Sequence, residues 1–420
     1  MMQNPEAARG EIQETRRVTR QKPTTGPCSE RCSLLQGGLD LDALYEAVIS
    51  WFAPEVLEAV AGPAETETER IARVWLAKGG KRWRPFLAAC AFLSFQGRRE
   101  VEDPIRQGGE APEDLRKAAV AVECFHKASL IHDDIEDGDG ERYGQKTLHA
   151  QYGVPIALNA GDFLLGEGYR LIGEIGVADG AKVQMVRAAA WGHRSLCIGQ
   201  GEELMAKRAR RPVAPARVIE IFRMKTAPAF EVALRVGTTL AGAGEDLWPA
   251  LARYGEALGI AYQIRDDLAD WSAGTPRGDA GTPRGRQASR PVEPAGDAGA
   301  APGDLEGGQP SILLSLAQER ATGETKLFLE AVGRGLLAAE GSSGRLARVL
   351  ADLGVEESAR RLLDRYRREA VTALEPLPGE GLRNVLERVV GKMFAGEGVR
   401  CAAIAGASRG RGNANGPRTL

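Results

Sequence analysis

The sequence is poor in cysteine and histidine, and it has no long apolar run. Its six cysteines are scattered over 420 residues. Only Cys28 and Cys32 lie close together, without the second pair or the histidines that would complete a zinc site. A membrane-spanning helix needs about 18 or more apolar residues in a row, and residues 1–22 lack the apolar core of a signal peptide. We therefore expect reduced thiols, no membrane span and a cytoplasmic protein.

The sequence also lacks an excess of one charge. Its 55 basic and 57 acidic residues give a formal net charge of -2. The whole chain therefore gives no electrostatic reason to expect a nucleic-acid partner or an anionic membrane surface. With 43% hydrophobic and 27% charged residues, the composition is that of an ordinary globular protein, which excludes disorder throughout.

The spacing of apolar residues predicts one helical domain. From Leu39 to Phe394 they recur mainly every three or four residues, and alternating β-branched runs are almost absent. We therefore predict an all-α domain over residues 37–398. Residues 1–36 and 399–420 are polar or glycine-rich without periodicity, so they are predicted to be disordered tails.

One segment interrupts the helical pattern. The near-duplicate hexapeptides at 273–278 and 280–285, both Ala-Gly-Thr-Pro-Arg-Gly, lie in a stretch rich in Pro, Gly and Ala. Such a composition cannot bury a core, so residues 272–303 are predicted to be a flexible insertion within the domain.

The first acidic motif follows an apolar stripe that starts near Pro112. The stripe continues into Leu-Ile-His-Asp-Asp-Ile-Glu-Asp, residues 130–137. On a helix, His126, Asp133 and Asp137 fall within about 20° of one line. Carboxylates four residues apart repel each other, and a cation between them would reverse the sign of this interaction. Oxygen ligands with room for water and phosphate are those that Mg²⁺ prefers.

A second acidic motif repeats this pattern. Asp266 and Asp270 are again four residues apart, with Asp267 beside the first, and an apolar helical run precedes them. Either motif alone could be a solvated helix end, since charge runs usually lie on the surface. Two motifs on helices that converge on one cavity could hold several metal ions around a diphosphate.

These motifs resemble those of the trans-isoprenyl diphosphate synthase family, the polyprenyl synthetases, over roughly residues 40–395. Three segments carry the resemblance: Gly79-Gly80-Lys81-Arg82-Trp83-Arg84-Pro85, Asp133-Asp134-Ile-Glu-Asp137 and Asp266-Asp267-Leu-Ala-Asp270. It implies an isoprenoid-synthase-type helical bundle around a central cavity. From the residues alone, Lys81 and Arg84 would put two cations on one helix face, which suits a diphosphate.

The resemblance also implies roles for individual residues. The implied metal ligands are Asp133, Asp134, Asp137, Asp266, Asp267 and Asp270, with about three Mg²⁺ ions per site. The implied catalytic residues are Asp133, Asp134, Asp137, Lys225, Asp266 and Asp267. The residues implied to contact isopentenyl diphosphate are Lys81, Arg84 and His126. Those implied to contact the allylic diphosphate are Arg142, Lys225, Thr226 and Gln263.

Two departures from the family pattern stand out. The family usually has two adjacent arginines after the first motif, whereas this chain has Arg142 and Tyr143. Binding of isopentenyl diphosphate would then be weaker, or the substrate would differ, and Tyr143→Arg should lower the KM or leave it unchanged. The family's Gly-Lys after the second motif is missing, and arginines of the insertion (Arg277, Arg284, Arg286 or Arg290) could replace it.

The function predicted from the resemblance is condensation of an allylic diphosphate with isopentenyl diphosphate to a longer prenyl diphosphate, by a homodimer. Ala128 and Ser129 are small, and Phe125 lies about two turns before Asp133, which suggests a product of about twenty carbons or longer. Two alternatives remain: a class I terpene cyclase on the same fold, favoured by Tyr143, and a non-catalytic subunit of a heteromeric synthase.

Overall fold

The computed structural model describes residues 39–95, 111–274, 310–334, 336 and 342–395. Within these ranges the chain is almost entirely helical, which confirms the predicted fold class. Both predicted tails, residues 275–303 of the predicted insertion and its four arginines lie outside the described residues. No helix in the described ranges is both long and apolar enough to cross a membrane.

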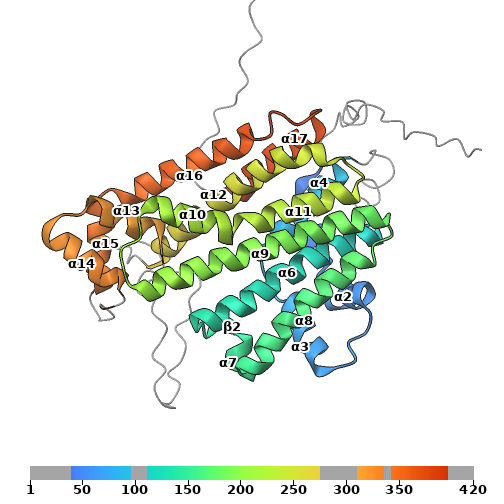
Figure 1. The fold of residues 1–420 in the computed structure, drawn as a ribbon, viewed down its shortest axis with the longest axis horizontal. Coiled ribbons are helices and arrows are strands. Elements are labelled where there is room, and N and C mark those ends of the chain that lie inside the picture. Colours follow the sequence, from blue (N-terminus) through green and yellow to red (C-terminus); the bar gives the residue numbers. More distant parts are fainter. Residues whose placement is uncertain (1–38, 96–110, 275–309, 335, 337–341, 396–420) are drawn as a thin grey trace, which may run out of the picture.

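Helices of very different length build the structure (Figure 1). In chain order they are α1 (Leu41–Ser50), α2 (Pro54–Ala61), α3 (Glu67–Ala77), α4 (Trp83–Leu93), α6 (Glu113–Asp137), α7 (Leu148–Tyr152), α8 (Val154–Gly173), α9 (Asp179–Ala209), α10 (Pro215–Lys225), α11 (Ala227–Leu240), the 3-10 turn η2 (Glu245–Leu247), α12 (Trp248–Gly274), α13 (Ile312–Arg320), α14 (Gly323–Gly333), α15 (Ser342–Asp352), α16 (Val355–Thr372) and α17 (Gly381–Met393).

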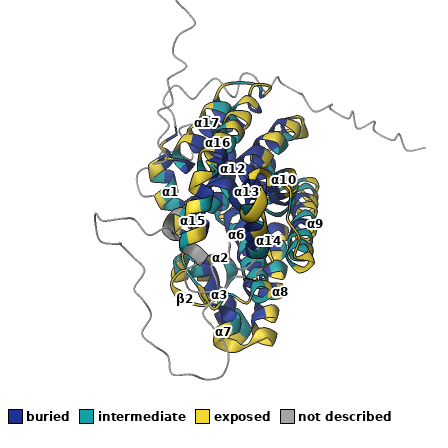
Figure 2. Cartoon of the chain, turned by 90° about the vertical axis from the view of Figure 1, so that its left-hand side faces the viewer, coloured by how far each residue is buried: buried dark blue, intermediate teal, exposed yellow. Residues whose placement is uncertain are grey.

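Helix α11 lies at the centre of the bundle. Nearly all of its residues are buried, as expected for a helix surrounded by others, and its buried carboxylate, Glu231, pairs with Arg235 one turn further on. It contacts α4, α6, α9, α10 and α12. The outer helices show the opposite pattern, with buried residues facing inward and exposed residues facing outward (Figure 2). The central helices therefore provide a rigid frame for the residues that face the interior.

Helix α6 carries the first acidic motif at its carboxyl end. Pro112 precedes its first turn, as predicted, and Gly138 ends it in a left-handed conformation with φ of 73°. The negative end of the helix dipole therefore lies beside the carboxylates of the motif. The dipole is unfavourable for each negative carboxylate, as is the repulsion between the carboxylates, and both effects favour a cation at this place.

Helix α12 carries the second motif and ends at Gly274. The predicted insertion was placed from residue 272, so its first three residues are helical instead. Ser272 and Ala273 are tolerated in a helix, so α12 continues to Gly274, a residue type that favours helix ends.

A two-stranded hairpin follows α6. Strand β1 (Glu141–Arg142) pairs with β2 (Gln145–Lys146) in antiparallel register. Tyr143 and Gly144 form its turn with φ of 56° and 70°. Positive φ at both turn residues matches the right-handed twist of the paired strands. The turn directs the Tyr143 side chain back towards the end of α3.

Candidate active site

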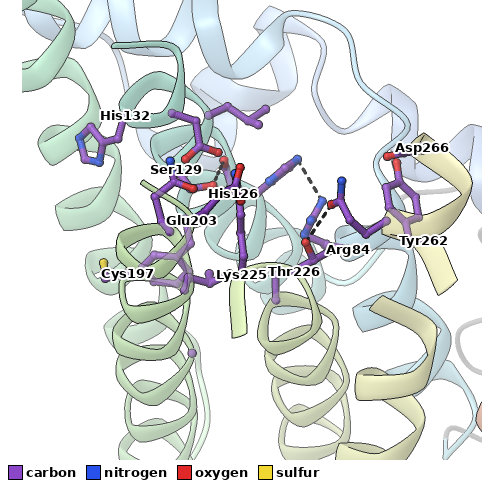
Figure 3. Close-up of a pocket in the computed structure, with 18 of the residues that line it drawn as sticks. Arg84, His126, Ser129, His132, Cys197, Glu203, Lys225, Thr226, Tyr262 and Asp266 are labelled. Atoms are coloured by element: carbon purple, nitrogen blue, oxygen red, sulfur yellow. Dashed lines mark hydrogen bonds and ion pairs between the residues drawn. The ribbon is translucent and has the colours of Figure 1, made fainter. Parts of the chain in front are cut away.

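A cavity of about 850 Å³ lies between α4, α6, α9, α10 and α12, and both acidic motifs contribute to its lining. Figure 3 shows Glu203 and Lys225 on one side, Tyr262 and Asp266 on the other, and Arg84 and His126 between them. Most of the predicted site residues meet here. Those that line the cavity are Lys81, Arg84, His126, Asp133, Asp137, Arg142, Lys225, Thr226, Gln263, Asp266 and Asp267.

Asp133 lies among several like charges on α6. Burial raises the pKa of its carboxyl to about 7; Lys225 opposes this shift, and the neighbouring carboxylates, including Glu203, add to it. One turn further on, the carboxylate of Asp137 pairs with Lys207 Nζ at 3.3 Å. The ionised form of Asp133 is therefore poorly compensated by the protein alone, as expected for a carboxylate that binds a cation.

Asp134 differs from its neighbour. It is buried and does not line the cavity. Its Oδ1 accepts a hydrogen bond from Arg142 Nε, and burial raises the pKa of its carboxyl to about 6 although Arg142 opposes the shift. In this arrangement Asp134 holds Arg142 at the edge of the cavity. Its predicted role as a metal ligand stays a prediction.

In the second motif, as in the first, neighbouring protein groups bind the carboxylates. Asp266 Oδ1 accepts a hydrogen bond from Arg265 Nη2 at 2.8 Å. Asp267 Oδ2 accepts hydrogen bonds from the backbone N–H of Ile312 at 2.8 Å and from Ser311 Oγ at 3.2 Å. Asp267 therefore joins α12 to the start of α13. The side chain of Asp270 lies outside the described residues.

Lys225, at the end of α10, is held by a carboxylate that the sequence reasoning missed. Its Nζ pairs with Glu203 Oε2 at 3.0 Å. Burial would lower the pKa of Lys225, but Glu203 and Asp133 outweigh it and raise the pKa. Gly199 makes this contact possible, because a Cβ there would overlap the backbone of Met224 and Lys225. Glu203 lies four residues after Gly199 on the same helix, which is the signal that could have identified it.

Arg84 and His126 lie between the two sides of the cavity and contact each other (Figure 3). Arg84 Nη1 lies 3.0 Å from His126 Nε2. An arginine can only donate, so Nε2 must accept and the ring proton lies on Nδ1. Burial first, and then Arg84, lower the pKa of His126 well below its usual value, so the ring is neutral at neutral pH. Nearby, the Thr226 hydroxyl donates to Gln263 Oε1 at 3.1 Å and fixes the amide.

Lys81 and Arg84 do not share a helix face, contrary to the prediction. Helix α4 begins only at Trp83, and Arg82 precedes it with φ of 48°. The left-handed residue reverses the chain, so Lys81 approaches the cavity from the turn, where its Nζ lies 5.7 Å from the centroid of the Tyr262 ring. Both cations still line the cavity.

Arg82, which was given no role from the sequence, is buried between the two. It pairs with Glu123 and donates to the backbone oxygens of Leu76, Ala77 and Lys78 at the end of α3. It therefore satisfies carbonyl groups that have no partner within the helix. Its position within the Lys81–Arg84 segment was the only hint to its importance.

The deep end of the cavity is apolar. Val122, Phe125, Leu165, Leu196 and Val232 line it. The Phe125 ring packs edge-on against Tyr169 of α8 with centroids 4.9 Å apart. Of the two small residues before the first motif, Ser129 lines the cavity, whereas Ala128 is fully buried outside it. The cavity therefore joins charged walls at the mouth to an apolar floor.

The chain is similar in sequence to known proteins. Residues 65–279 match the polyprenyl synthetase family. A geranylgeranyl pyrophosphate synthase of Geoglobus acetivorans is 34% identical over 209 residues, which are 48% of this chain and 59% of that protein. An octaprenyl diphosphate synthase of Haemophilus influenzae is 28% identical over 315 residues, 73% of this chain and 82% of that protein. The first five curated relatives are matched over 55–62% of their own length.

Solved structures give the same result for the fold. The geranylgeranyl pyrophosphate synthetase of Geoglobus acetivorans has a TM-score of 0.66 and 26% identity, over 84% of this chain and 99% of that one. A geranylgeranyl pyrophosphate synthase of Corynebacterium glutamicum, complexed with isoprenyl diphosphate and magnesium, has a TM-score of 0.66 and 24% identity, over 85% of this chain and 99% of that one. Since the family match spans more than half of the chain and covers both acidic motifs, the protein belongs to the polyprenyl synthetase family.

Proposed function

We propose that the protein is a prenyltransferase that condenses an allylic diphosphate with isopentenyl diphosphate. The observation that carries the proposal is the arrangement of charges around one cavity. The acidic motifs on α6 and α12 both line it, and Lys81, Arg84 and His126 line the same cavity. Such a cavity suits two phosphorylated substrates, one that must lose its diphosphate and one that must keep it.

The carboxylates fit Mg²⁺ by their chemistry. Within the described residues, no three potential metal-ligating side chains are grouped closely enough to hold an ion by themselves. Mg²⁺ usually binds one or two carboxylates and completes its coordination with water and substrate phosphate. We propose that Asp133, Asp137, Asp266 and Asp267 supply the carboxylates. The bound ions would neutralise the leaving diphosphate as its C–O bond breaks.

The remaining side chains divide into two subsites. Lys225 and Arg142, both anchored by carboxylates, would hold the allylic diphosphate together with Thr226 and Gln263. Arg84 and Lys81 would bind the diphosphate of isopentenyl diphosphate, and neutral His126 can donate through Nδ1. The apolar floor would exclude water from the allylic carbocation and receive the growing chain.

Two alternatives are less well supported. A terpene cyclase needs no second diphosphate subsite, yet Lys81, Arg84 and His126 all line this cavity. A non-catalytic subunit has no reason to retain carboxylates that repel each other. Incubation with Mg²⁺, labelled isopentenyl diphosphate and each short allylic diphosphate distinguishes these possibilities. Label in a longer prenyl diphosphate supports the proposal, a hydrocarbon formed without label supports the cyclase, and no conversion supports the binding subunit.

We propose a product of about twenty carbons or longer, limited by the floor at Phe125. Phe125→Ala should lengthen the product because it removes the ring that lies between the cavity and Tyr169. Chromatography of the products measures the change. Phe328→Ala, a buried aromatic of α14 outside the cavity lining, is the control. An unchanged distribution in Phe125→Ala would remove this residue from the floor.

We also propose a homodimer formed through α8 and α9. Several large apolar side chains on these helices are exposed: Val154, Ile156, Leu158, Val183, Val186, Trp191 and Ile198. An apolar face of this kind is uncommon on a monomer.

The cytoplasmic location stays a prediction from the sequence.

The double variant Leu158→Glu/Val183→Glu should shift the protein from dimer to monomer, because it would bury charges in the proposed interface. Light scattering after size exclusion measures the mass. Leu327→Glu places the same charge at an exposed apolar residue of α14 and should leave the mass unchanged. A wild-type monomer, or a double variant that remains dimeric, would contradict the proposed interface.

A further inference from the structure

Lys127 is a fully buried lysine that does not line the cavity. It lies on α6, one residue after His126. Its Nζ donates hydrogen bonds to the backbone oxygens of Lys78 at 2.9 Å and Gly79 at 2.6 Å. These two residues form the turn that leads to Lys81. Lys127 therefore supports the segment that carries one of the cations at the cavity mouth.

The same ammonium group lies beneath Tyr143. Its Nζ is 4.3 Å from the centroid of the Tyr143 ring, and this ring in turn lies beside Trp75 with centroids 6.4 Å apart. Gly80 is the third partner. With φ of 143° it occupies a conformation that other residues rarely adopt, and a Cβ there would lie 3.3 Å from Tyr143 Oη and 3.7 Å from Lys127 Nζ. The turn, the ring and the ammonium are thus in mutual contact.

The burial of this charge is unfavourable. Burial lowers the pKa of Lys127 to about 7; Glu123 opposes the shift, and Arg82, Arg142 and Lys78 add to it. An apolar side chain of similar length would avoid this penalty. A buried cation that is costly to the fold and lies directly behind the wall of a charged cavity is better explained by function than by stability.

We propose that Lys127 and Tyr143 form one unit of the isopentenyl diphosphate subsite. The Tyr143 hydroxyl, beside Gly80 on the cavity wall, donates to the diphosphate. Lys127 is a positioning residue that holds the ring and the Lys78–Gly80 turn from behind and adds positive potential. This inference rests on the proposed function. It explains how a tyrosine can stand where the family usually has an arginine: the cation comes from α6 and not from the hairpin.

Kinetic constants for the two substrates test this unit. Lys127→Met should raise the KM for isopentenyl diphosphate about tenfold, since the Tyr143 ring and the Lys78–Gly80 turn lose their support, while the KM for the allylic substrate changes less than about twofold. Lys117→Met is the matched control, because Lys117 lies on the same helix outside the cavity and pairs with exposed Glu113. Its two KM values should equal those of the wild type.

Two variants of Tyr143 show whether Lys127 acts through the ring. Tyr143→Phe removes the hydroxyl and should raise the same KM about fivefold. Combined with Lys127→Met, it should add little to the single variant, because the two residues work as one unit.

Tyr143→Arg should raise the KM for isopentenyl diphosphate when Lys127 is present, because the new cation meets Lys127. It should lower this KM in the Lys127→Met background. The position of Lys127 thereby reverses the expectation from sequence for Tyr143→Arg alone.

The outcomes separate this inference from the proposed function. If the wild type does not incorporate isopentenyl diphosphate, the proposed function fails. If the wild type is active and Lys127→Met leaves that KM unchanged, or raises both KM values equally, the unit does not exist as proposed. Additive effects of Lys127→Met and Tyr143→Phe would show that Lys127 does not act through the tyrosine. Thermal melting at the pH of the assay shows whether the variants fold, so that a change in KM is not caused by unfolding.

Discussion

Asp133→Ala and Asp266→Ala should each lower kcat by about a thousandfold or more, because metal-assisted charge stabilisation supplies several kcal/mol of the barrier reduction. The two residues belong to different helices, and both line the cavity. Removing either carboxylate would leave the leaving diphosphate neutralised from one side only. Steady-state kinetics with saturating Mg²⁺ and both substrates measure the loss.

The fold should survive both substitutions. Asp133 is destabilising in its ionised form when no cation is bound, since burial and neighbouring carboxylates raise its pKa to about 7. Its removal should therefore not lower Tm in the absence of metal. Asp179→Ala, an exposed carboxylate at the start of α9, is the control for the loss of one charge. Near-normal turnover in Asp133→Ala or Asp266→Ala would contradict the assignment of the metal site.

The second large effect is expected from pH. A cation at the first motif must replace a proton on Asp133, because the pKa of this carboxyl is raised to about 7. The apparent affinity for Mg²⁺ should therefore fall about tenfold between pH 8 and pH 6 through Asp133 alone. Titration of activity with Mg²⁺ at fixed substrate measures this change. An affinity independent of pH in this range would show that Asp133 does not bind the ion.

In the absence of metal, Asp133 should make the folded protein less stable as the pH rises. An ordinary ion-paired carboxylate has the opposite effect. The folded state keeps the Asp133 proton up to about pH 7, whereas the usual pKa of an aspartate in an unfolded chain is 3.8. The folded state therefore binds more protons between these values, and the free energy of unfolding falls as the pH rises through this window. Added Mg²⁺ removes the penalty, so it should raise Tm more at pH 8 than at pH 6.

The sequence was sufficient for those features that depend on spacing along one helix. The helical period placed Asp133 and Asp137 on one face of α6, at the end of the apolar stripe that leads into the motif. Repetition of the same spacing at Asp266 predicted a second wall. These conclusions need only 3.6 residues per turn and the requirement that apolar residues point inward. The structure confirms that both motifs line one cavity.

Contacts between distant segments could not be predicted in the same way. Arg82 adopts a left-handed conformation that no local pattern announces, and its partner Glu123 lies 41 residues further along the chain. Glu203 belongs to the site only because it pairs with Lys225, which the turn between α9 and α10 brings close to it. Lys127 appeared to be an ordinary member of a helix. Its significance comes from the hairpin that returns Tyr143 to the end of α3.

Helix α9 approaches its neighbours closely at Gly192 and Gly199, and the atoms it meets there determine whether either glycine can be replaced. At Gly199, a Cβ would overlap the main chain of Met224 and Lys225, which is present whatever side chains these residues carry. No second substitution can therefore relieve the clash. At Gly192, two turns earlier, the Cβ would meet the side chain of Val232, and a smaller residue there could make room. Two glycines of one helix thus differ in kind: Gly192 can vary together with a partner, whereas Gly199 is constrained by the backbone alone.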